Sequence, residues 1–383
     1  MGNHQCCCSA KDDADAVLAS MDAVSITDDA LSVGLRITGG NTEQERIFTA
    51  KLTKSEGENL GLSVECVTWR RILPVLSIKG GAAGRWNETQ SAKIRPGDSI
   101  LKVNSVQGRA EKMLEECRAD IVELTFCRCL TQEFLVEDLS RLVETRNCGP
   151  ILIRLSWHDA GVFNGRDGRP DARMRLPSGE HDFPANSGLQ NGIALLQPIA
   201  EKYVPRLLSH ADLWALAANV AIKVMGGPTI QTHFGRRDAK SSEEGVSSEE
   251  GRLVDGDKDA KHLREIYYPK GLDDKDIVAL SGLRHVGMYT GPQTSTKDTK
   301  FTNAYFKDLF IKPWKLELTQ AGQRQYKCGA TLMLPVDLAM VDDAGFKKHV
   351  ARYAKDQDVW FQEFAEAWQK LQELGCGELW DEL

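Results

Sequence analysis

The sequence predicts a multidomain chain, in which a small β-rich domain over residues 45–129 precedes a mostly α-helical domain over residues 131–376. A length of 383 residues suits two or three domains of roughly 100–200 residues each. Short runs that alternate apolar and polar residues are concentrated in the first region, and such alternation indicates strands. Apolar residues spaced three and four apart recur through the second region and indicate helices.

The overall composition is that of a globular protein, with 42% hydrophobic and 27% charged residues. The net charge of −7 disfavours a nucleic-acid binder, because such proteins need a concentrated basic surface. No apolar run reaches the roughly 18 residues of a membrane span. Three of the ten cysteines are adjacent, at Cys6, Cys7 and Cys8, and the others are scattered. This distribution indicates free thiols in a reducing compartment rather than a disulfide framework.

Residues 1–10, which read MGNHQCCCSA, combine two acylation signals. Gly2 follows the initiator Met, where N-myristoylation occurs, and the adjacent cysteines are candidates for thioacylation. A second acyl chain matters because one myristoyl chain binds a membrane only marginally. Cys6 stands where the myristoylation motif has Ser or Thr, so an unmodified leader is the alternative. The acylation hypothesis predicts a protein anchored at the cytoplasmic face of a membrane through a flexible tether at residues 11–44.

The β-rich region contains five strand candidates separated by Gly and Pro, and such punctuation is typical of a compact β domain. A helix-like segment, RAEKMLEECRA, precedes the last of them. In chain order the strand candidates are RIFTAKLTK, NLGLSVECV, ILPVLSI, DSILKVN and IVELTF.

Within this region, the stretch IRPGDSILKVNSVQG resembles the PDZ family, in which a G-D turn leads into a strand that ends in V-N. The resemblance implies that Leu60, Gly61 and Leu62 form a loop whose backbone N–H groups hold the C-terminal carboxylate of a partner peptide. The position at which many PDZ domains have a specificity-determining His is nearest to Ala110 or Glu111 here. A spacer of PDZ shape without a peptide ligand is the alternative.

The second region contains at least six amphipathic helix candidates and ends in a short tail at residues 377–383. In the segment GPILIRLSWHDAG, Arg154, Trp157 and His158 follow the helical spacing i, i+3 and i+4 and therefore project from one face. Spacing alone leaves two interpretations open. His158 is either a core histidine with a satisfied hydrogen bond, or a base beside a cation over one buried reactant.

The motif R-L-S-W-H-D-A-G resembles the distal helix of class I haem peroxidases, the group that contains ascorbate and cytochrome c peroxidases. Further matches follow in family order and extend the resemblance over nearly all of residues 131–376. The resemblance implies a mostly α-helical fold that binds haem b between two helical layers, with hydrogen peroxide as the substrate. The further matches include ANSGLQNGIALLQPI, GRLVDGDKDA, GLDDKDIVALSG, KPWKLELTQAGQRQYKCGATLMLPVDLAM and YAKDQDVWFQEFAEAWQKLQELG.

The resemblance assigns roles to four residues on the distal side of the haem. His158 takes a proton from peroxide and returns it to the leaving oxygen, a role that suits imidazole because its pKa lies near neutrality. Arg154 stabilises the charge that develops as the O–O bond breaks, because its guanidinium is always charged. Trp157 packs over the haem, and Asn186 accepts the other ring N–H of His158. All four residues are present in the expected order.

The proximal side departs from the family pattern A-L-S-G-(G/A)-H, because this chain reads ALSG-Leu283-Arg284-His285. Arg284 stands in the ligand position when no gap is introduced, and a guanidinium has no lone pair for iron. His285 becomes the ligand if the helix absorbs one extra residue, and this is the register that we expect. Asp337 matches the carboxylate that supports the proximal His, whereas Gln293 replaces the family Trp beneath the haem.

The electron donor stays open at this stage. Gln293 weakens a cytochrome c peroxidase interpretation, and the segment after Gly287 lacks the Arg that ascorbate peroxidases use at their substrate edge. Arg146 and Cys148 stand where the family has contacts at the haem edge. The leading hypothesis is a membrane-tethered haem peroxidase with an unidentified electron donor. The alternative is a PDZ–pseudoperoxidase that binds haem as a scaffold or sensor.

Overall fold

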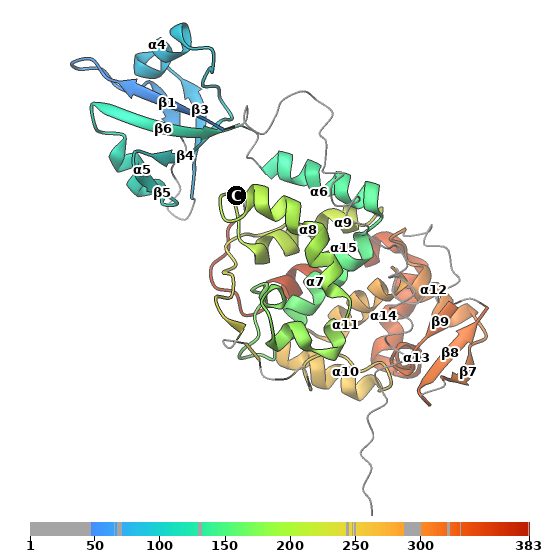
Figure 1. The fold of residues 1–383 in the computed structure, drawn as a ribbon. Helices are drawn as coiled ribbons and strands as arrows, with labels where there is room; N and C mark the ends of the chain where they lie inside the picture. Colours follow the sequence, from blue (N-terminus) through green and yellow to red (C-terminus); the bar gives the residue numbers. More distant parts are fainter. Residues whose placement is uncertain are drawn as a thin grey trace, which may run out of the picture. The chain divides into compact units, whose positions relative to one another are not determined.

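A computed structural model of the chain gives the arrangement of most residues after position 46 (Figure 1). Gly2, the cysteine triplet and Gln293 lie outside the described residues. For His285 only the backbone is described. The described residues are 47–64, 66, 71–128, 132–242, 245, 246, 248, 250–286, 300–319, 322–329, 331–381 and 383.

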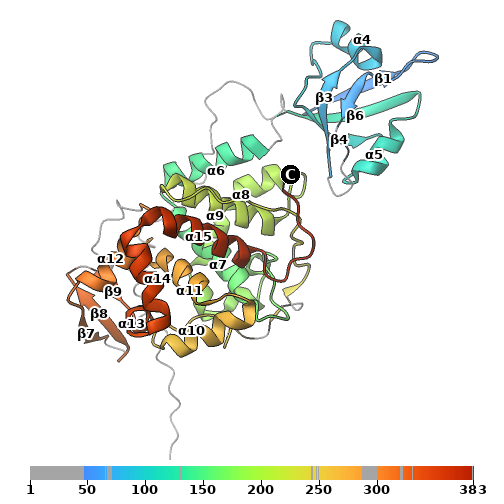
Figure 2. The same ribbon diagram turned by 180° about the vertical axis from the view of Figure 1, so that it is seen from behind.

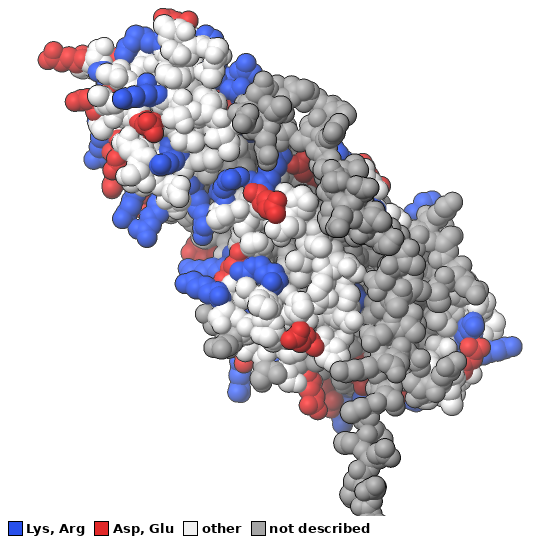
Figure 3. Space-filling model, in the orientation of Figure 1, with Lys and Arg blue, Asp and Glu red and all other residues white. Residues whose placement is uncertain are grey.

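The described residues form two compact units. The helical unit contains residues 139–196 and 211–379, and the β-rich unit contains residues 47–138 with 197–210 and 380–383. None of the helices among the described residues combines the length and the apolar composition that a membrane span requires. On the face drawn in Figure 3, both basic and acidic side chains occur among the described residues.

The β-rich unit is built on one antiparallel sheet with the strand order β1-β6-β4-β3-β2, and β5 pairs with β4. Each of the five strand candidates contains one of these strands, so the prediction of a β-rich region is confirmed. Helix α5 lies in the segment predicted to be helical, whereas α4 and β5 were not predicted. The elements are β1 (Ile47–Thr53), β2 (Leu62–Val64), β3 (Leu73–Ile78), α4 (Gly81–Thr89), β4 (Ser99–Val103), β5 (Val106–Gln107), α5 (Ala110–Glu116) and β6 (Ile121–Cys127).

Alternation along the strands places one apolar face in the core of this unit. In β6, Val122, Leu124 and Phe126 are fully buried, whereas Ile121 and Glu123, which alternate with them, are exposed. β1 pairs with β6 over its whole length, from Ile47 opposite Cys127 to Thr53 opposite Ile121. The core is completed by buried side chains from the other strands and both helices, among them Leu52, Leu73, Val75, Ala83, Ile100, Val103 and Met113.

The loop at Leu60, Gly61 and Leu62 is held against the start of α4. The N–H of Lys79 donates to the carbonyl of Gly61 at 2.7 Å, and the N–H of Ala83 donates to the carbonyl of Leu60 at 2.9 Å. Gly61 has a φ of +73°, and a Cβ at this position would overlap the carbonyl oxygen of Gly80. Only glycine fits such a conformation and such a close approach. The loop leads directly into β2, which is the last strand of the sheet.

The helical unit confirms the prediction of a mostly α-helical C-terminal region. In Figure 2, α14 and α15 lie at the front of this unit. In α9, the twelve residues from Ala211 to Ile222 are all buried, because small Ala side chains let neighbouring helices approach from every side. The helices that follow residue 131 in the chain are α6 (Gln132–Arg146), α7 (Gly149–Gly161), α8 (Leu189–Tyr203), α9 (His210–Val224), α10 (Ala260–Tyr267), α11 (Asp274–Ser281), α12 (Ala304–Ile311), α13 (Pro335–Asp342), α14 (Ala344–Lys355) and α15 (Gln357–Gln372).

Helix α15 joins three other helices through side-chain hydrogen bonds. The indole of Trp360 donates to the carbonyl of Ala279 in α11 at 3.0 Å, and the indole of Trp368 donates to Asn219 in α9 at 2.8 Å. Gln372 donates to the hydroxyl of Ser156 in α7 at 3.0 Å. Trp360 also stacks on Phe301 with ring centroids 4.9 Å apart. These contacts fix α7, α9 and α11 relative to one common helix.

A three-stranded antiparallel sheet with the order β7-β8-β9 lies beside α12 and α13 (Figure 1). Its strands are β7 (Lys315–Leu318), β8 (Arg324–Cys328) and β9 (Thr331–Met333). This sheet was not predicted from residue spacing, because its strands have three to five residues and contain one buried residue, Met333. Such strands lack the buried alternation from which a strand is predicted.

Candidate functional site

Helix α7 carries three of the predicted site residues and has the bounds expected from its sequence, Gly149 to Gly161. Pro150 lies in its first turn, where the missing N–H of proline costs no hydrogen bond. At Gly149, a Cβ would overlap the sulfur of Met225, so the start of the helix packs closely on the end of α9. His158 lies on the buried face, with 7% of its surface exposed.

The imidazole of His158 is paired with the side chain of Asn186. His158 Nδ1 lies 2.8 Å from Asn186 Oδ1. The amide is oriented by its other end, because Nδ2 donates to the carbonyl of Glu180 at 2.7 Å. Oδ1 therefore faces the imidazole as an acceptor, and Nδ1 must carry the ring proton. Nε2 of His158 is left with its lone pair.

Arg154 lies one helical turn before His158 and points to the same region. Its Nε donates a long hydrogen bond to Nε2 of His158 at 3.4 Å, and its Nη2 donates to the carbonyl of Ala185 at 2.7 Å. Ala185 precedes Asn186 in the 3-10 segment Pro184–Asn186, so one short segment holds both the cation and the imidazole. A fixed cation next to a lone pair is suited to stabilise negative charge on a reactant.

The pKa of His158 is lowered to about 3, first by burial and then by the positive charge of Arg154. The hydrogen bond with Asn186 acts in the opposite direction but is the smaller effect. The imidazole is therefore neutral near pH 7 and can accept a proton at Nε2. Its conjugate acid is strong in this environment and returns the proton readily. The structure thus brings Arg154, His158 and Asn186 together as the sequence predicts.

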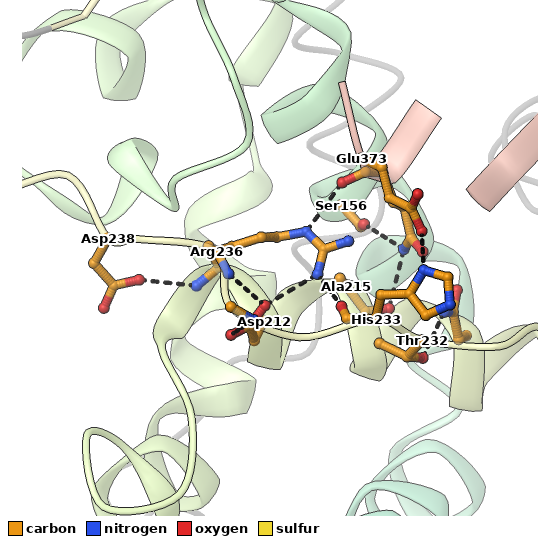
Figure 4. Close-up of polar contacts among 12 residues, drawn as sticks. Ser156, Asp212, Ala215, Thr232, His233, Arg236, Asp238 and Glu373 are labelled. Atoms are coloured by element: carbon orange, nitrogen blue, oxygen red, sulfur yellow. Dashed lines mark hydrogen bonds and ion pairs between the residues drawn. The ribbon is translucent and has the colours of Figure 1, made fainter. Parts of the chain in front are cut away.

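A second polar network connects α7 with α9 and α15 (Figure 4). Arg236 donates to the backbone carbonyl of Gln372 at 3.0 Å and pairs with Asp212 of α9 at 3.0 Å. Gln372 in turn donates to Ser156 of α7 and to the carbonyl of Ala215 at 3.0 Å each. The Arg236 side chain is 1% exposed, so the ion pair is fully buried and its hydrogen bonds are needed to offset desolvation.

Buried acids lie beside the distal residues and were not identified from the sequence. Asp159 accepts a hydrogen bond from the N–H of Ala172 at 2.9 Å, and its pKa is raised well above the ordinary value by burial and by Asp171 and Glu180. Burial likewise raises the pKa of Glu180 to about 7. Arg173 is the cation between Asp171 and Glu180. The only feature of the sequence that could have identified one of these acids is the position of Asp159 directly after His158.

Trp157 connects α7 to the end of α10. Its indole is hydrogen-bonded to the hydroxyl of Tyr267, and this bond and the positive charge of Arg284 both favour the ionised form of that tyrosine. Burial is the larger effect and raises the pKa of Tyr267 to about 12. The charge of Arg284 therefore lowers the pKa of Tyr267, whose hydroxyl is hydrogen-bonded to Trp157 of α7. Arg284 and His158, which is also in α7, are more than 120 positions apart in the sequence.

On the opposite side of the site, α11 ends in the 3-10 segment η6 (Gly282–His285). Nη1 of Arg284 lies 3.2 Å from Oδ1 of Asp337, which has no exposed surface. Oδ1 also accepts the hydroxyl proton of Tyr305 at 2.8 Å, and Oδ2 accepts the N–H of Leu334 at 2.8 Å. The carboxylate predicted to support a proximal His thus has Arg284 as its ionic partner. Because the side chain of His285 is not described, its role as ligand stays a prediction.

The remaining predicted residues of the helical unit lie around the start of α7. Cys148 is buried and is therefore not exposed to a substrate at the surface. Burial raises the pKa of its thiol to about 11, so the thiol is protonated near pH 7. Arg146, the last residue of α6, is exposed. The predicted peptide loop at Gly61 belongs to the β-rich unit.

Comparisons with known proteins concern mainly the helical unit. A family model described as "Peroxidase" matches residues 135–356. A probable L-ascorbate peroxidase 3, peroxisomal, of Oryza sativa subsp. japonica is 42% identical over 247 residues, which cover 62% of this chain and 77% of that protein. A mitochondrial cytochrome c peroxidase of Aspergillus fumigatus is 39% identical over 240 residues, 59% of this chain and 63% of that protein. A putative heme-binding peroxidase of Gibberella zeae is 36% identical over 245 residues, 60% of this chain and 72% of that protein.

The protonation state of His158 can be measured directly. We expect the His158 ring to remain neutral from about pH 8 to pH 5, where an ordinary histidine gains a proton, because its pKa is about 3. Arg154→Gln should raise this pKa, because the neighbouring positive charge that disfavours imidazolium is removed. Titration of ring-labelled histidines by NMR checks both, with His158→Gln to identify the resonance. A His158 resonance that titrates near 6.5 in the unmodified protein contradicts the prediction.

Proposed function

The chain belongs to the peroxidase family, and from that premise we propose how its own residues carry out the reaction. It is a haem peroxidase, an oxidoreductase that acts on hydrogen peroxide. The reaction takes two electrons and two protons from outside the peroxide and releases two molecules of water. Bound haem supplies the iron that exchanges these electrons.

The residues of the helical unit fit a haem on the side of α7. A neutral imidazole with an unprotonated Nε2 and an adjacent guanidinium that donates a long hydrogen bond to it form a set of groups suited to a polar reactant held at a metal. Trp157 stands between these two residues in the sequence and offers an aromatic surface. On the opposite side we propose His285 as the iron ligand, since it is adjacent to Arg284 and carries the nitrogen donor that Arg284 lacks.

The observation that carries the mechanism is the orientation of the Asn186 amide. By accepting the hydrogen bond from Nδ1–H, Asn186 keeps Nε2 of His158 unprotonated and able to take a proton from hydrogen peroxide. Nε2 then returns the proton to the oxygen that leaves as water. Arg154, held by the carbonyl of Ala185, stabilises the negative charge that develops as the O–O bond breaks.

The mechanism predicts a selective loss in His158→Leu. Peroxide cleavage should slow by about 10²–10⁴-fold, because general acid–base catalysis is removed, while haem binding persists. The control is His181→Leu, the same substitution at a histidine whose side chain is 36% exposed and pairs with Asp182. Rapid mixing of haem-loaded protein with peroxide, followed by absorbance, measures the rate. An unchanged rate in His158→Leu excludes His158 from the mechanism.

The reductant is proposed to be a small molecule or a redox protein at the haem edge. Relatives named for ascorbate and for cytochrome c have similar identities, 42% and 39%, so identity does not favour one donor class. A second candidate function is a haem-binding scaffold or sensor with little turnover. The specific observation that favours it is the Arg284–Asp337 ion pair, which engages the carboxylate that would support a proximal histidine.

We further propose that acyl chains on Gly2 and on Cys6, Cys7 or Cys8 anchor the enzyme at the cytoplasmic face of a membrane. What supports this is the combination of two acylation signals within the first eight residues. Two chains are needed because each buried CH₂ contributes only about 0.8 kcal/mol, so one chain gives reversible binding.

The anchoring proposal predicts that Gly2→Ala moves the protein from the membrane fraction to the soluble fraction. Replacement of the three cysteines by Ser should leave weak, reversible association through one remaining chain. Gly34→Ala, the same substitution within the predicted tether, is the matched control. Fractionation of cells that express each variant provides the measurement. Gly2→Ala protein that stays in the membrane pellet rules out the lipid anchor.

We also propose that the β-rich unit binds the C-terminus of a partner protein. Two observations support this proposal. Gly61 has a positive φ in the loop before β2, and β2 is an edge strand, which pairs with β3 alone among the described strands. An extended peptide adds to such an edge through backbone hydrogen bonds, and the loop N–H groups suit its carboxylate. The first residue of α5, Ala110, is fully buried and offers no polar group for side-chain selectivity.

Peptide binding can be tested with matched ligands and matched variants. Full-length protein should bind some free C-terminal peptides and lose them when the terminal carboxylate is amidated. Gly61→Ala should abolish binding, because its Cβ would overlap Gly80. Gly57→Ala has the same φ of +73° but meets no atom within 4 Å, so it should bind normally. A peptide-array screen with equal binding of free and amidated peptides refutes the proposal.

A further inference from the structure

The three-stranded sheet of the helical unit has an edge that the peroxidase mechanism leaves unused. Strand β7 pairs with β8 alone among the described strands, and it lies at the periphery of this unit in both views (Figures 1 and 2). All four residues of β7 are exposed. An edge strand presents backbone N–H and C=O groups along its free side, and these groups can pair with a further strand.

The hydrogen bonds between β7 and β8 decide which residues face the free side. Directly after β7, the N–H of Thr319 donates to the carbonyl of Gln323 at 2.9 Å, so the backbone of Thr319 faces the neighbouring strand. Backbone groups of successive residues point to alternate sides of an antiparallel strand. Counted back from Thr319, the N–H and C=O groups of Leu318 and Leu316 therefore face the free side.

The side chains of the same two leucines belong to an exposed apolar surface. Leu316 is 55% exposed and Leu318 is 64% exposed. Phe310 and Ile311 at the end of α12 are 42% and 74% exposed. Among the described residues of the helical unit, four of the five exposed large apolar side chains thus lie between positions 310 and 318. Such a concentration of exposed apolar side chains is typical of an interaction surface.

The charged side chains of β7 alternate with the leucines. Lys315 and Glu317 flank Leu316, and Lys315 lies opposite a like-charged residue of β8, Lys327. Glu317 is 3.8 Å from the same lysine, but these two side chains are 46% and 47% exposed, so their ion pair contributes little. β7 thus carries a cation with a like charge opposite it, and an anion that is still accessible to a partner.

A two-fold axis through Leu316 makes this edge complementary to itself. When two copies of β7 pair antiparallel about that axis, each Leu316 lies opposite its equivalent, and each Lys315 lies opposite Glu317 of the other copy. Opposite charges in such positions stabilise a strand pair, whereas like charges destabilise it. An axis through Glu317 places two glutamates opposite each other, and an axis through Lys315 places two lysines there. An axis through Leu318 leaves both charges without an opposite charge.

We propose that a second copy of this chain docks on β7, and that the two sheets join into one continuous antiparallel sheet. The backbone groups of Leu316 and Leu318 supply the hydrogen bonds, and the two leucine side chains become covered. Two pairs of Lys315 with Glu317, one on each side of the axis, select the register. Because one surface pairs with itself, the assembly closes as a dimer. The dimer requires neither haem nor turnover and therefore goes beyond the proposed peroxidase activity.

The test is self-association of the unacylated full-length chain, measured by sedimentation velocity over a range of concentrations. Lys315→Glu and Glu317→Lys should each weaken the dimer about tenfold, because each converts both cross-strand pairs into like charges. An equimolar mixture of the two variants should restore association, since two acids of one chain then face two lysines of the other. The double variant with exchanged charges should restore it as well. Lys347→Glu, at an exposed lysine of α14, is the matched control.

Hydrogen exchange tests the register without any substitution. The N–H groups of Leu316 and Leu318 should exchange more slowly at high protein concentration than at low concentration, because only the dimer bonds them. The N–H groups of β8 that pair with β7 within one copy are the internal control and should not change. This measurement decides should a variant fail to fold.

Three results would overturn the proposal. The unmodified chain stays monomeric at every concentration, both single variants associate as the unmodified chain does, or their mixture associates no better than either variant alone. Monomeric protein that instead binds vesicles of anionic lipid, and loses this binding in Leu316→Ser, assigns the surface to a membrane and likewise overturns the dimer. Failure of the peroxidase function is distinguishable, because it would leave sedimentation and exchange unchanged.

Discussion

Both halves of the peroxidase site depend on one helix, α15, to which they are fixed separately. Gln372 at its C-terminal end holds Ser156, which lies between Arg154 and Trp157 on α7. Trp360 near its start holds the end of α11 and leaves room for no side chain at Gly282. Because the contacts come from two rigid indoles and an amide NH2 that donates twice, the length of this helix sets the distance between the two halves. Precise catalytic geometry requires such support from packed elements.

The two halves differ in how they treat buried charge. On the distal side, burial and Arg154 keep His158 neutral, and the available proton is placed on Nδ1 by Asn186. A neutral base costs little to bury and still accepts a proton when a reactant provides one. On the other side, Asp337 remains beside a permanent cation. On the distal side, a neutral imidazole is available to accept a proton. On the opposite side, the negative charge of Asp337 is balanced by the positive charge of Arg284.

Much of this arrangement could be predicted from the sequence where local spacing and side-chain chemistry agree. Helix α7 has the expected bounds, because its apolar spacing is regular and Pro150 marks its start. The pairing of His158 with Asn186 was predicted from the resemblance, since no local pattern links residues 28 positions apart. The sheet of β7, β8 and β9 was missed because its strands contain one buried residue, Met333, and therefore lack the buried alternation. The ion pair of Arg284 with Asp337 was not predicted. Position 284 was considered only as a possible iron ligand, and the need of a buried carboxylate for a cation was not considered.

Arg284 is informative because it stands beside the proposed ligand, His285, and pairs with the carboxylate predicted to support that ligand. If both Arg284 and Asp337 were apolar, the site would be an ordinary apolar core, which often costs no stability. Instead Asp337 is buried and has three partners, the guanidinium of Arg284, the hydroxyl of Tyr305 and the N–H of Leu334. A buried carboxylate needs a partner whether or not haem is present, and Arg284 provides it in the protein alone. The charge of this buried carboxylate is therefore balanced by a side chain of the protein itself, since Arg284 supplies the cation.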